Sequence, residues 1–303
     1  MTAGRLALPV LVASACVLGL APVLVRLTDT GPAAAGFWRL AFALPVLALI
    51  ASRAKTSDPV DGRGPDRWMA LAGLFFALDM SFWHYGLTLT SVANATVLCN
   101  LTPVVVTGFA WLVFKERPRR LFLAALALAI CGAGAMAFGA SGSGLARERS
   151  LLGDALSLSV TLWYASYFLC VQRARRGASA SRVMLWSSAA GAPLMLLAAL
   201  LMGEQLRPTG PEGWLFCLSL GLVHVVGQGG VAWSLGQLPA ALTAITILVQ
   251  PVVAGLLGWA IFAETLTPVQ LVGGAVVLGA VVMAQASAAK KKGAKAEASA
   301  PVS

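Results

Sequence analysis

The segment L101-T-P-V-V-V-T-G-F-A-W-L-V-F-K-E-R117 has a second copy later in the chain, V249-Q-P-V-V-A-G-L-L-G-W-A-I-F-A-E-T265. A shift of 148 residues aligns the two copies, with six identities in the fourteen positions that begin at Pro103. The same shift brings Trp38 onto Trp186. We therefore expect two related halves that together cover nearly the whole chain.

The composition is that of an integral membrane protein. Of the 303 residues, 58% are hydrophobic and 11% are charged, and the mean hydropathy is +0.82. Ten apolar runs have about the 20 residues that a helix needs to cross a bilayer. They cover residues 6–27, 32–51, 68–88, 92–114, 120–139, 151–172, 183–202, 213–235, 239–262 and 268–286. The runs lack the period-2 alternation of a β-barrel, so an all-α fold of ten transmembrane helices is predicted.

Each half contains five runs, and this odd number makes the second half enter the membrane in the opposite sense. We predict a first repeat over residues 1–140, an inverted second repeat over residues 150–287, and a basic disordered tail over residues 288–303. Glu116 then lies at the cytoplasmic end of its helix and its counterpart Glu264 at the outer end; both are interpreted as structural. The Lys and Arg residues around Glu116 are absent around Glu264, as expected when Lys and Arg set the orientation.

The positive charges are distributed unevenly between the two predicted sides. With a cytoplasmic N-terminus, 17 of the 22 Lys and Arg residues lie in inside segments and four in outside segments. This distribution fits the positive-inside rule, so both termini are predicted to lie in the cytoplasm, with the chain in the cell inner (plasma) membrane. It also accounts for the net charge of +10 without a nucleic-acid partner.

Inverted repeats are typical of secondary transporters, which bind substrates near the bilayer midplane between their halves. The repeated Pro-x12-Glu spacing from Pro103 and Pro251, together with F37-W-R-L-A-F42, resembles the drug/metabolite transporter superfamily, in its EamA-type ten-helix branch. The resemblance implies alternating access around a central cavity, often for the export of amino acids or other small metabolites. The chain departs from that family at G19-L-A-P-V-L-V25, where a Trp-Gly pair is often present.

Asp79 is an acidic residue near the centre of an apolar run. Ionisable groups inside a bilayer are costly and usually face a bundle interior or an aqueous cavity. Helical spacing puts Trp83 on the same face, with His84 beside it. These residues are candidates for substrate binding or proton coupling; an acid that only hydrogen-bonds between helices is the alternative.

His224 and Gln228 are one helical turn apart in the eighth run, so both are candidates to line the same cavity wall. A histidine that only contacts a neighbouring helix is the alternative. Arg39, in the second run, is interpreted as structural, either extending outward or pairing with a carboxylate.

Aromatic and amide side chains supply further binding candidates. Trp163 and Tyr167 share a helix face in the sixth run, where interhelical packing is the alternative. Asn100, Thr102 and Gln250 lie beside the repeated prolines. They either orient a polar substrate or satisfy backbone carbonyls that the prolines leave free.

Pro103 and Pro251 are predicted to kink their helices, because each lacks an amide hydrogen and crowds the carbonyl four residues earlier. They are candidates for gating or for shape alone. The patterns A129-I-C-G-A133 and A275-V-V-L-G279 suit close helix packing or a dimer face, so a monomer or a homodimer is expected.

Enzymatic signatures are absent. The sequence has no HExxH, no GxSxG and no Walker A motif, so no catalytic residue and no direct use of ATP is predicted. The five cysteines form no CxxC pair, and we expect no metal and no cofactor.

The predicted function is secondary active transport of a small organic metabolite, an amino acid or related compound, by efflux, with proton coupling or exchange. The predicted partners are this small-molecule substrate, the lipid bilayer and protons. An uptake or exchange carrier for a larger metabolite such as a nucleoside-type cofactor is the alternative. A channel and an intramembrane enzyme are the alternatives from other classes.

Overall fold

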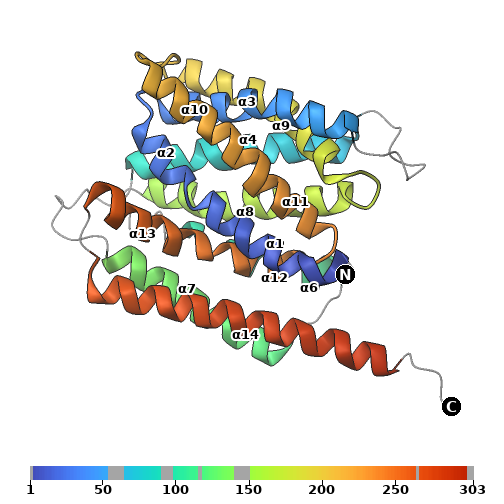
Figure 1. The fold of residues 1–303 in the computed structure, drawn as a ribbon. Helices are drawn as coiled ribbons and strands as arrows, with labels where there is room; N and C mark the ends of the chain where they lie inside the picture. The colour runs from blue at the N-terminus through green and yellow to red at the C-terminus, as the bar shows by residue number, and fades with distance from the viewer. Residues whose placement is uncertain are drawn as a thin grey trace.

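The computed structural model describes residues 3–53, 65–89, 98–114, 118–139, 151–263 and 266–298, and within these ranges the chain contains no strand. The helices are α1 (Ala3–Leu18), α2 (Ala21–Leu27), α3 (Pro32–Arg53), α4 (Arg67–Leu89), α6 (Thr102–Phe114), α7 (Arg120–Gly139), α8 (Leu151–Ala174), α9 (Ala180–Leu201), α10 (Pro211–Val223), the π-helix η1 (His224–Gln228), α11 (Gly229–Leu235), α12 (Ala240–Ile247), α13 (Val249–Phe262) and α14 (Pro268–Ala298). Figure 1 shows them as a bundle of long helices. The all-α class predicted from the sequence is confirmed.

Seven helical segments are long and apolar enough to cross a membrane. Three are formed by consecutive helices, namely α1 with α2, α10 with η1 and α11, and α12 with α13; the others lie in α3, α8, α9 and α14. The helices α4, α6 and α7 coincide with predicted runs but are not among the seven.

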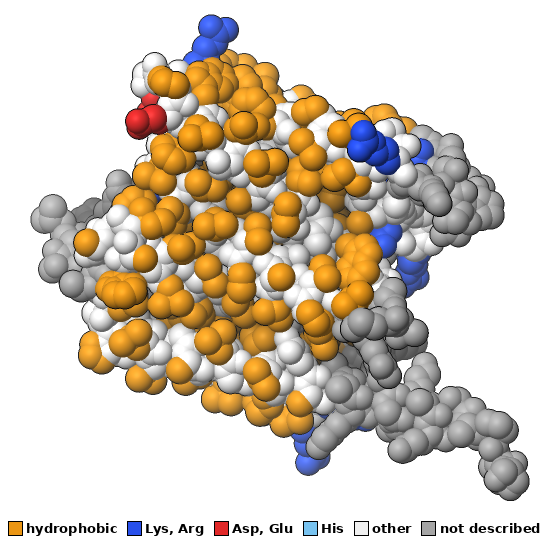
Figure 2. Space-filling view, in the orientation of Figure 1, with side chains coloured by type: hydrophobic (Ala, Val, Ile, Leu, Met, Phe, Trp, Pro, Cys, Tyr) orange, Lys and Arg blue, Asp and Glu red, His pale blue; other side chains and the backbone are white. Residues whose placement is uncertain are grey.

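Hydrophobic side chains cover most of the face shown in Figure 2, and the described charged side chains lie near its edges. Leu112 and Leu201, for example, are each 78% exposed. Lipid tails are as apolar as these side chains, so such exposure is natural in a bilayer. The chain is therefore a multi-pass membrane protein.

Helices from the two halves of the sequence are interleaved. The most extensive packing joins α4 to α8 and α9, α3 to α9 and α10, and α7 to α14. In Figure 1, α7 and α14 form a pair at the edge of the bundle, and α14 ends at the same end of the bundle at which α1 begins. The first-half helices α3 and α4 therefore face the second-half helices α8, α9 and α10 across the centre.

Two glycines that are 148 residues apart permit close contacts between the halves. A Cβ on Gly73 of α4 would lie 2.8 Å from the Cβ of Ala190 in α9. A Cβ on Gly221 of α10 would lie 2.7 Å from the Cβ of Phe42 in α3. Phe42 and Ala190 are themselves separated by 148 residues. The two contacts therefore use equivalent positions of the sequence repeat.

The pair of α7 and α14 is also held by small residues. A Cβ on Gly132 would lie 2.7 Å from the carbonyl oxygen of Gly273, and Ala129 is fully buried. The small residues from Ala129 to Ala133 thus support packing within one chain.

A helix break lies just before each repeated proline. Leu248, with φ −63° and ψ −3°, separates α12 from α13, and a turn at residues 100–101 precedes α6. Pro103 and Pro251 consequently lie in the first turn of a helix, where proline is tolerated. Pro103 has no amide hydrogen to donate to the Cys99 carbonyl. The Thr102 hydroxyl donates a hydrogen bond of 2.8 Å to that carbonyl instead.

The end of the chain differs from the prediction. The helix α14 continues through Ala298, past the predicted boundary at residue 287, so residues 288–298 are helical where a disordered tail was predicted. Ala and Lys have high helix propensities, and a helix that has already started extends through such residues at little cost.

Candidate functional site

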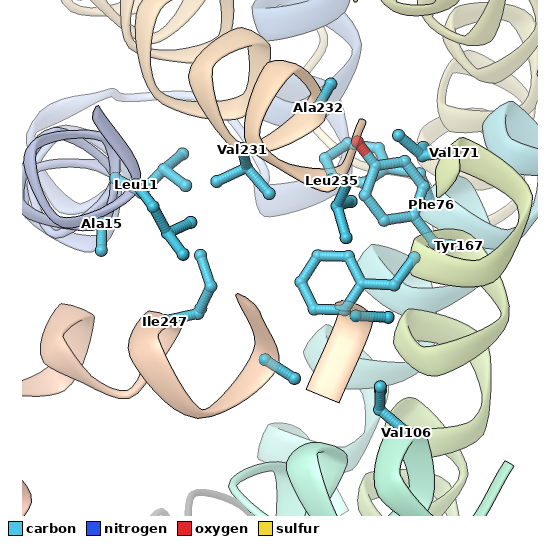
Figure 3. Close-up of a cluster of buried hydrophobic side chains, with 14 of the residues drawn as sticks. Leu11, Ala15, Phe76, Val106, Tyr167, Val171, Val231, Ala232, Leu235 and Ile247 are labelled. Carbon is cyan, nitrogen blue, oxygen red and sulfur yellow. The ribbon is translucent and has the colours of Figure 1, made fainter. Parts of the chain in front are cut away.

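The ring of Phe76, on α4, is the hub of a buried group of polar and aromatic side chains. The ring centroid of Tyr167 lies 5.4 Å from it, that of His224 lies 5.5 Å from it, and the Arg39 guanidinium carbon lies 5.6 Å from it. Phe76 and Tyr167 are labelled close together in Figure 3. We define the central cluster by eight residues: Arg39, Phe76, Asp79, Tyr164, Tyr167, Ser188, His224 and Gln228.

Two charged residues of the central cluster are buried at the centre of the bundle. Arg39 is 7% exposed and Asp79 is 8% exposed. Each is within range of the other's charge, but they form no direct ion pair among the described residues, and Arg39 Nε has no hydrogen-bond partner. Asp79 also lies within electrostatic range of Cys99 and of both tyrosines. Because buried charges are costly without partners, this arrangement is suited to binding a charged or polar group.

His224 is held by a hydrogen bond from outside its own helix. Its Nε2 lies 3.1 Å from Ser188 Oγ of α9, whereas its Nδ1 has no hydrogen-bond partner. His224 opens the π-helix η1, and such turns occur frequently at functional sites. The equivalent residues of the first half, 76–80, lie in the regular α-helix α4.

Gln228 closes the same π-helical turn and is 1% exposed. Its side chain lies beside the hydroxyls of Tyr164 and Tyr167, but its Nε2 forms no hydrogen bond of normal geometry. The Tyr167 hydroxyl lies 3.8 Å from Met184 Sδ instead. The tyrosine rings are stacked, with centroids 5.8 Å apart. The pair thus forms an aromatic wall beside an unpaired amide.

Seven buried polar side-chain atoms of the described residues have no hydrogen-bond partner. Three belong to the central cluster: Arg39 Nε, His224 Nδ1 and Gln228 Nε2. Since buried polar groups are nearly always paired, a concentration of unpaired atoms in one place marks a position where a ligand or water completes the network.

An apolar layer lies on one side of the central cluster. Val171 is one helical turn beyond Tyr167 and Leu235 is two turns beyond Gln228, toward the end of the bundle at which α8 and α11 end. Leu11 of α1 joins them, and all three are at most 2% exposed (Figure 3). These apolar side chains lie farther toward that end than Tyr167 and Gln228 do.

The opposite end of the bundle carries a hydrogen-bonded corner, formed by residues 28–38 and 204–214. The Glu204 carboxylate accepts a hydrogen bond of 2.8 Å from the Ala34 amide, and Asp29 accepts hydrogen bonds from the amide and the hydroxyl of Thr209. Trp38 Nε1 donates to the Leu206 carbonyl at 2.7 Å. These bonds join the α2–α3 connection to the α9–α10 connection.

The remaining sequence candidates lie outside the central cluster. Trp163 packs between Phe75 and Phe82, with its Nε1 unpaired, and Asn100 Nδ2 is also unpaired. The Thr102 hydroxyl donates its hydrogen bond to the Cys99 carbonyl.

Trp83 and Gln250 are partly buried. Glu116, Glu264 and the side chain of His84 lie outside the described residues.

Four members of the central cluster were not among the predicted binding residues: Arg39, Phe76, Tyr164 and Ser188. Arg39 was interpreted as structural, but it is buried beside Phe76, and Ser188 and Phe76 were not singled out. A signal for Phe76 was present, because Phe76 and His224 are 148 residues apart and thus equivalent in the repeat. No local pattern marked Ser188, since its role depends on a contact with another helix.

Comparison with known proteins identifies relatives along nearly the full length. The profile of the EamA-like transporter family matches residues 5–138 and again residues 151–285. A protein of Archaeoglobus fulgidus described as an uncharacterized transporter is 28% identical over 277 residues, which cover 90% of this chain and 94% of that protein. A solved structure, described only as a crystal structure of a protein, shares the fold with a TM-score of 0.75, at 18% identity, over 92% of this chain and 96% of that one.

Proposed function

This chain belongs to the EamA-like transporter family and is a membrane transporter, and on that premise we propose that it is a secondary carrier of a small organic metabolite. The proposed solute is an amino acid or a related compound that is exported across the inner membrane. Its movement is coupled to protons or to exchange with a second solute.

The observation that carries this proposal is the central cluster itself. It combines residues of α3 and α4 from the first half with residues of α8, α9 and η1 from the second half. Seven of its eight members are buried and Tyr164 is partly buried, yet three of its polar atoms lack partners. A site at the interface of two repeats, lined by both, is the arrangement that a carrier needs to face each side of the membrane in turn.

We propose that the halves are inverted repeats of five transmembrane helices each, related by a pseudo-two-fold axis near the rings of Phe76 and His224. These two residues are equivalent in the repeat and face each other across 5.5 Å. The equivalent contacts of Gly73 with α9 and of Gly221 with α3 support the same axis. Exchange of conformations between two such halves produces alternating access.

The proposed orientation has both termini in the cytoplasm, which the distribution of Lys and Arg supports. With this orientation, we propose that the apolar layer of Leu11, Val171 and Leu235 closes the central cluster toward the cytoplasm. Opening on that side requires α1, α8 and α11 to separate. The helix breaks before Pro103 and Pro251 are candidate hinges for this motion.

The test is transport by the full chain reconstituted in proteoliposomes. Thermal-shift screening of the purified protein against metabolites selects solutes, and counterflow with a labelled solute then measures carrier activity. We expect saturable flux accelerated by unlabelled solute on the opposite side. Flux that does not saturate, or that exceeds carrier rates, would identify a channel and contradict the proposal.

Coupling is tested with Asp79→Asn, which keeps the size of the side chain but removes its charge and its capacity to exchange a proton. We expect slower transport with a weaker dependence on the proton gradient. Asp66→Asn, at the exposed start of α4, is the matched control. Equal transport and equal gradient dependence in both variants would remove Asp79 from the mechanism.

A further inference from the structure

The unpaired nitrogens of the central cluster share one chemical character. Arg39 Nε and Gln228 Nε2 carry hydrogen and can only donate hydrogen bonds. His224 Nδ1 is either a donor or an acceptor, depending on where the imidazole carries its proton. All three residues are at least nine-tenths buried, so water outside the bundle does not satisfy them.

Ser188 contacts one of the two ring nitrogens of His224, which bears on where the imidazole carries its proton. Its Oγ is buried and contacts His224 Nε2 at 3.1 Å, whereas the neighbouring Ser187 hydroxyl donates to the Met184 carbonyl. When the Ser188 hydroxyl donates to Nε2, the proton of neutral His224 resides on Nδ1, and the third unpaired nitrogen is then also a donor.

The three residues share neighbours within the central cluster. Arg39 and His224 both flank the Phe76 ring, at 5.6 Å and 5.5 Å, and the charge of Arg39 acts on His224. Gln228 is on the same π-helical turn as His224 and lies beside Tyr167, whose ring is also 5.4 Å from Phe76. A buried cation with two further unpaired nitrogens in the same cluster favours a ligand group with acceptor oxygens and a negative charge.

We propose that Arg39, His224 and Gln228 bind the carboxylate of the transported solute, with Ser188 as a positioning residue that orients His224. This inference rests on the proposed carrier function and narrows its solute class to carboxylates. An organic cation without a carboxylate leaves all three donors unpaired. A phosphate dianion brings two negative charges close to Asp79, whereas a carboxylate brings one.

The probes are matched sets of solutes, with side chains from methyl to benzyl. Each set contains an amino acid, its carboxamide, its decarboxylated amine and its deaminated acid. Thermal stabilisation and counterflow are measured with the full chain. We expect the two members with a carboxylate to bind about tenfold or more tightly than the amide and the amine, as charge-assisted hydrogen bonds predict.

Gln228→Glu is the sharpest variant, because it keeps the shape of the side chain and replaces a donor with a negatively charged acceptor. It should lower the affinity for carboxylate solutes about tenfold or more, so that the preference for them is lost, while counterflow of amines persists. Arg39→Gln should also lower the affinity for carboxylate solutes. Arg53→Gln, at the end of the same helix, is its control. Ser188→Ala should reduce the ratio of acid to amide affinity, whereas a purely structural role would lower the affinity for both equally.

Saturable counterflow of amines or amides with no preference for carboxylates would overturn this inference and leave the carrier function standing. An unchanged acid-to-amide ratio in Gln228→Glu would also overturn it. If no member of any set is bound or transported, both proposals fall.

Discussion

The central cluster and the corner at the bundle end both contain polar groups next to buried helices, but they differ in how these groups are paired. In the corner, Glu204, Asp29 and Trp38 all have partners with short hydrogen bonds, and only Thr30 Oγ1 is among the unpaired buried atoms of the described residues. In the central cluster, Arg39, His224 and Gln228 each keep an atom without a partner. A hydrogen-bond network whose groups are paired holds the helices in a fixed arrangement, whereas a network with unpaired groups is completed by a ligand or water that binds and dissociates.

This difference separates structural polar residues from candidate binding residues without reference to sequence position. Glu204 and Arg39 are both ionisable, but Glu204 caps the start of α3 through the Ala34 amide. Changes in the corner should therefore alter stability more than substrate affinity. Changes in the cluster should alter affinity, unless they remove its apolar framework.

Phe76→Ala is expected to have the largest effect on stability, because Phe76 contacts members of the cluster from α3, α8 and η1. Removal of a buried phenylalanine ring should lower the free energy of unfolding in detergent by about 3 kcal/mol or more. Phe109→Ala on α6, where the side chain is 36% exposed, is the control and should cost much less. Equal losses in the two variants would contradict the role of Phe76 as the hub.

Glu204→Ala should have an intermediate effect. It removes the acceptor of the Ala34 amide at the start of α3, and a lost helix cap costs about 1 kcal/mol. The same unfolding measurement detects this loss, while the KM for a transported solute should stay unchanged. A change in KM without a change in stability would reverse the assignment of the corner as structural. Glu212→Ala, in the first turn of α10, is the control.

Asp29 should give the smallest effect, a small contribution to stability that depends on pH. Hydrogen bonds from the side chain and then the backbone of Thr209 hold the pKa of Asp29 below its usual range. A lowered pKa in the folded state contributes stability above the unfolded pKa, and this contribution is lost as the pH falls through the folded pKa.

The melting temperature of the wild type should therefore exceed that of Asp29→Asn by a constant margin above about pH 5 and by a shrinking margin below about pH 4. The melting temperatures of both proteins across this pH range, with Asp66→Asn as a control, measure the effect. A margin that widens toward acid pH would show that the carboxylate is not stabilised by Thr209.

Much of this protein was predictable because the signals are local or repeated along the chain. The apolar runs predicted where the described helices lie, and the resemblance to the EamA-type family is confirmed by the profile match to both halves. The missing amide hydrogens of Pro103 and Pro251 marked the places where helices are interrupted. Asp79, His224 and Gln228 were predictable as candidates because polar groups are rare in such runs.

Only the tertiary structure decided which of these residues meet. Ser188 reaches His224 from another helix, Arg39 joins them beside Phe76, and a π-helical turn that no sequence pattern announced carries both His224 and Gln228. Helix formation depends on neighbours within one turn, and membrane insertion depends on the summed hydropathy of about 20 residues. Whether a buried donor has a partner depends on how distant helices pack, and that is a property of the folded chain alone.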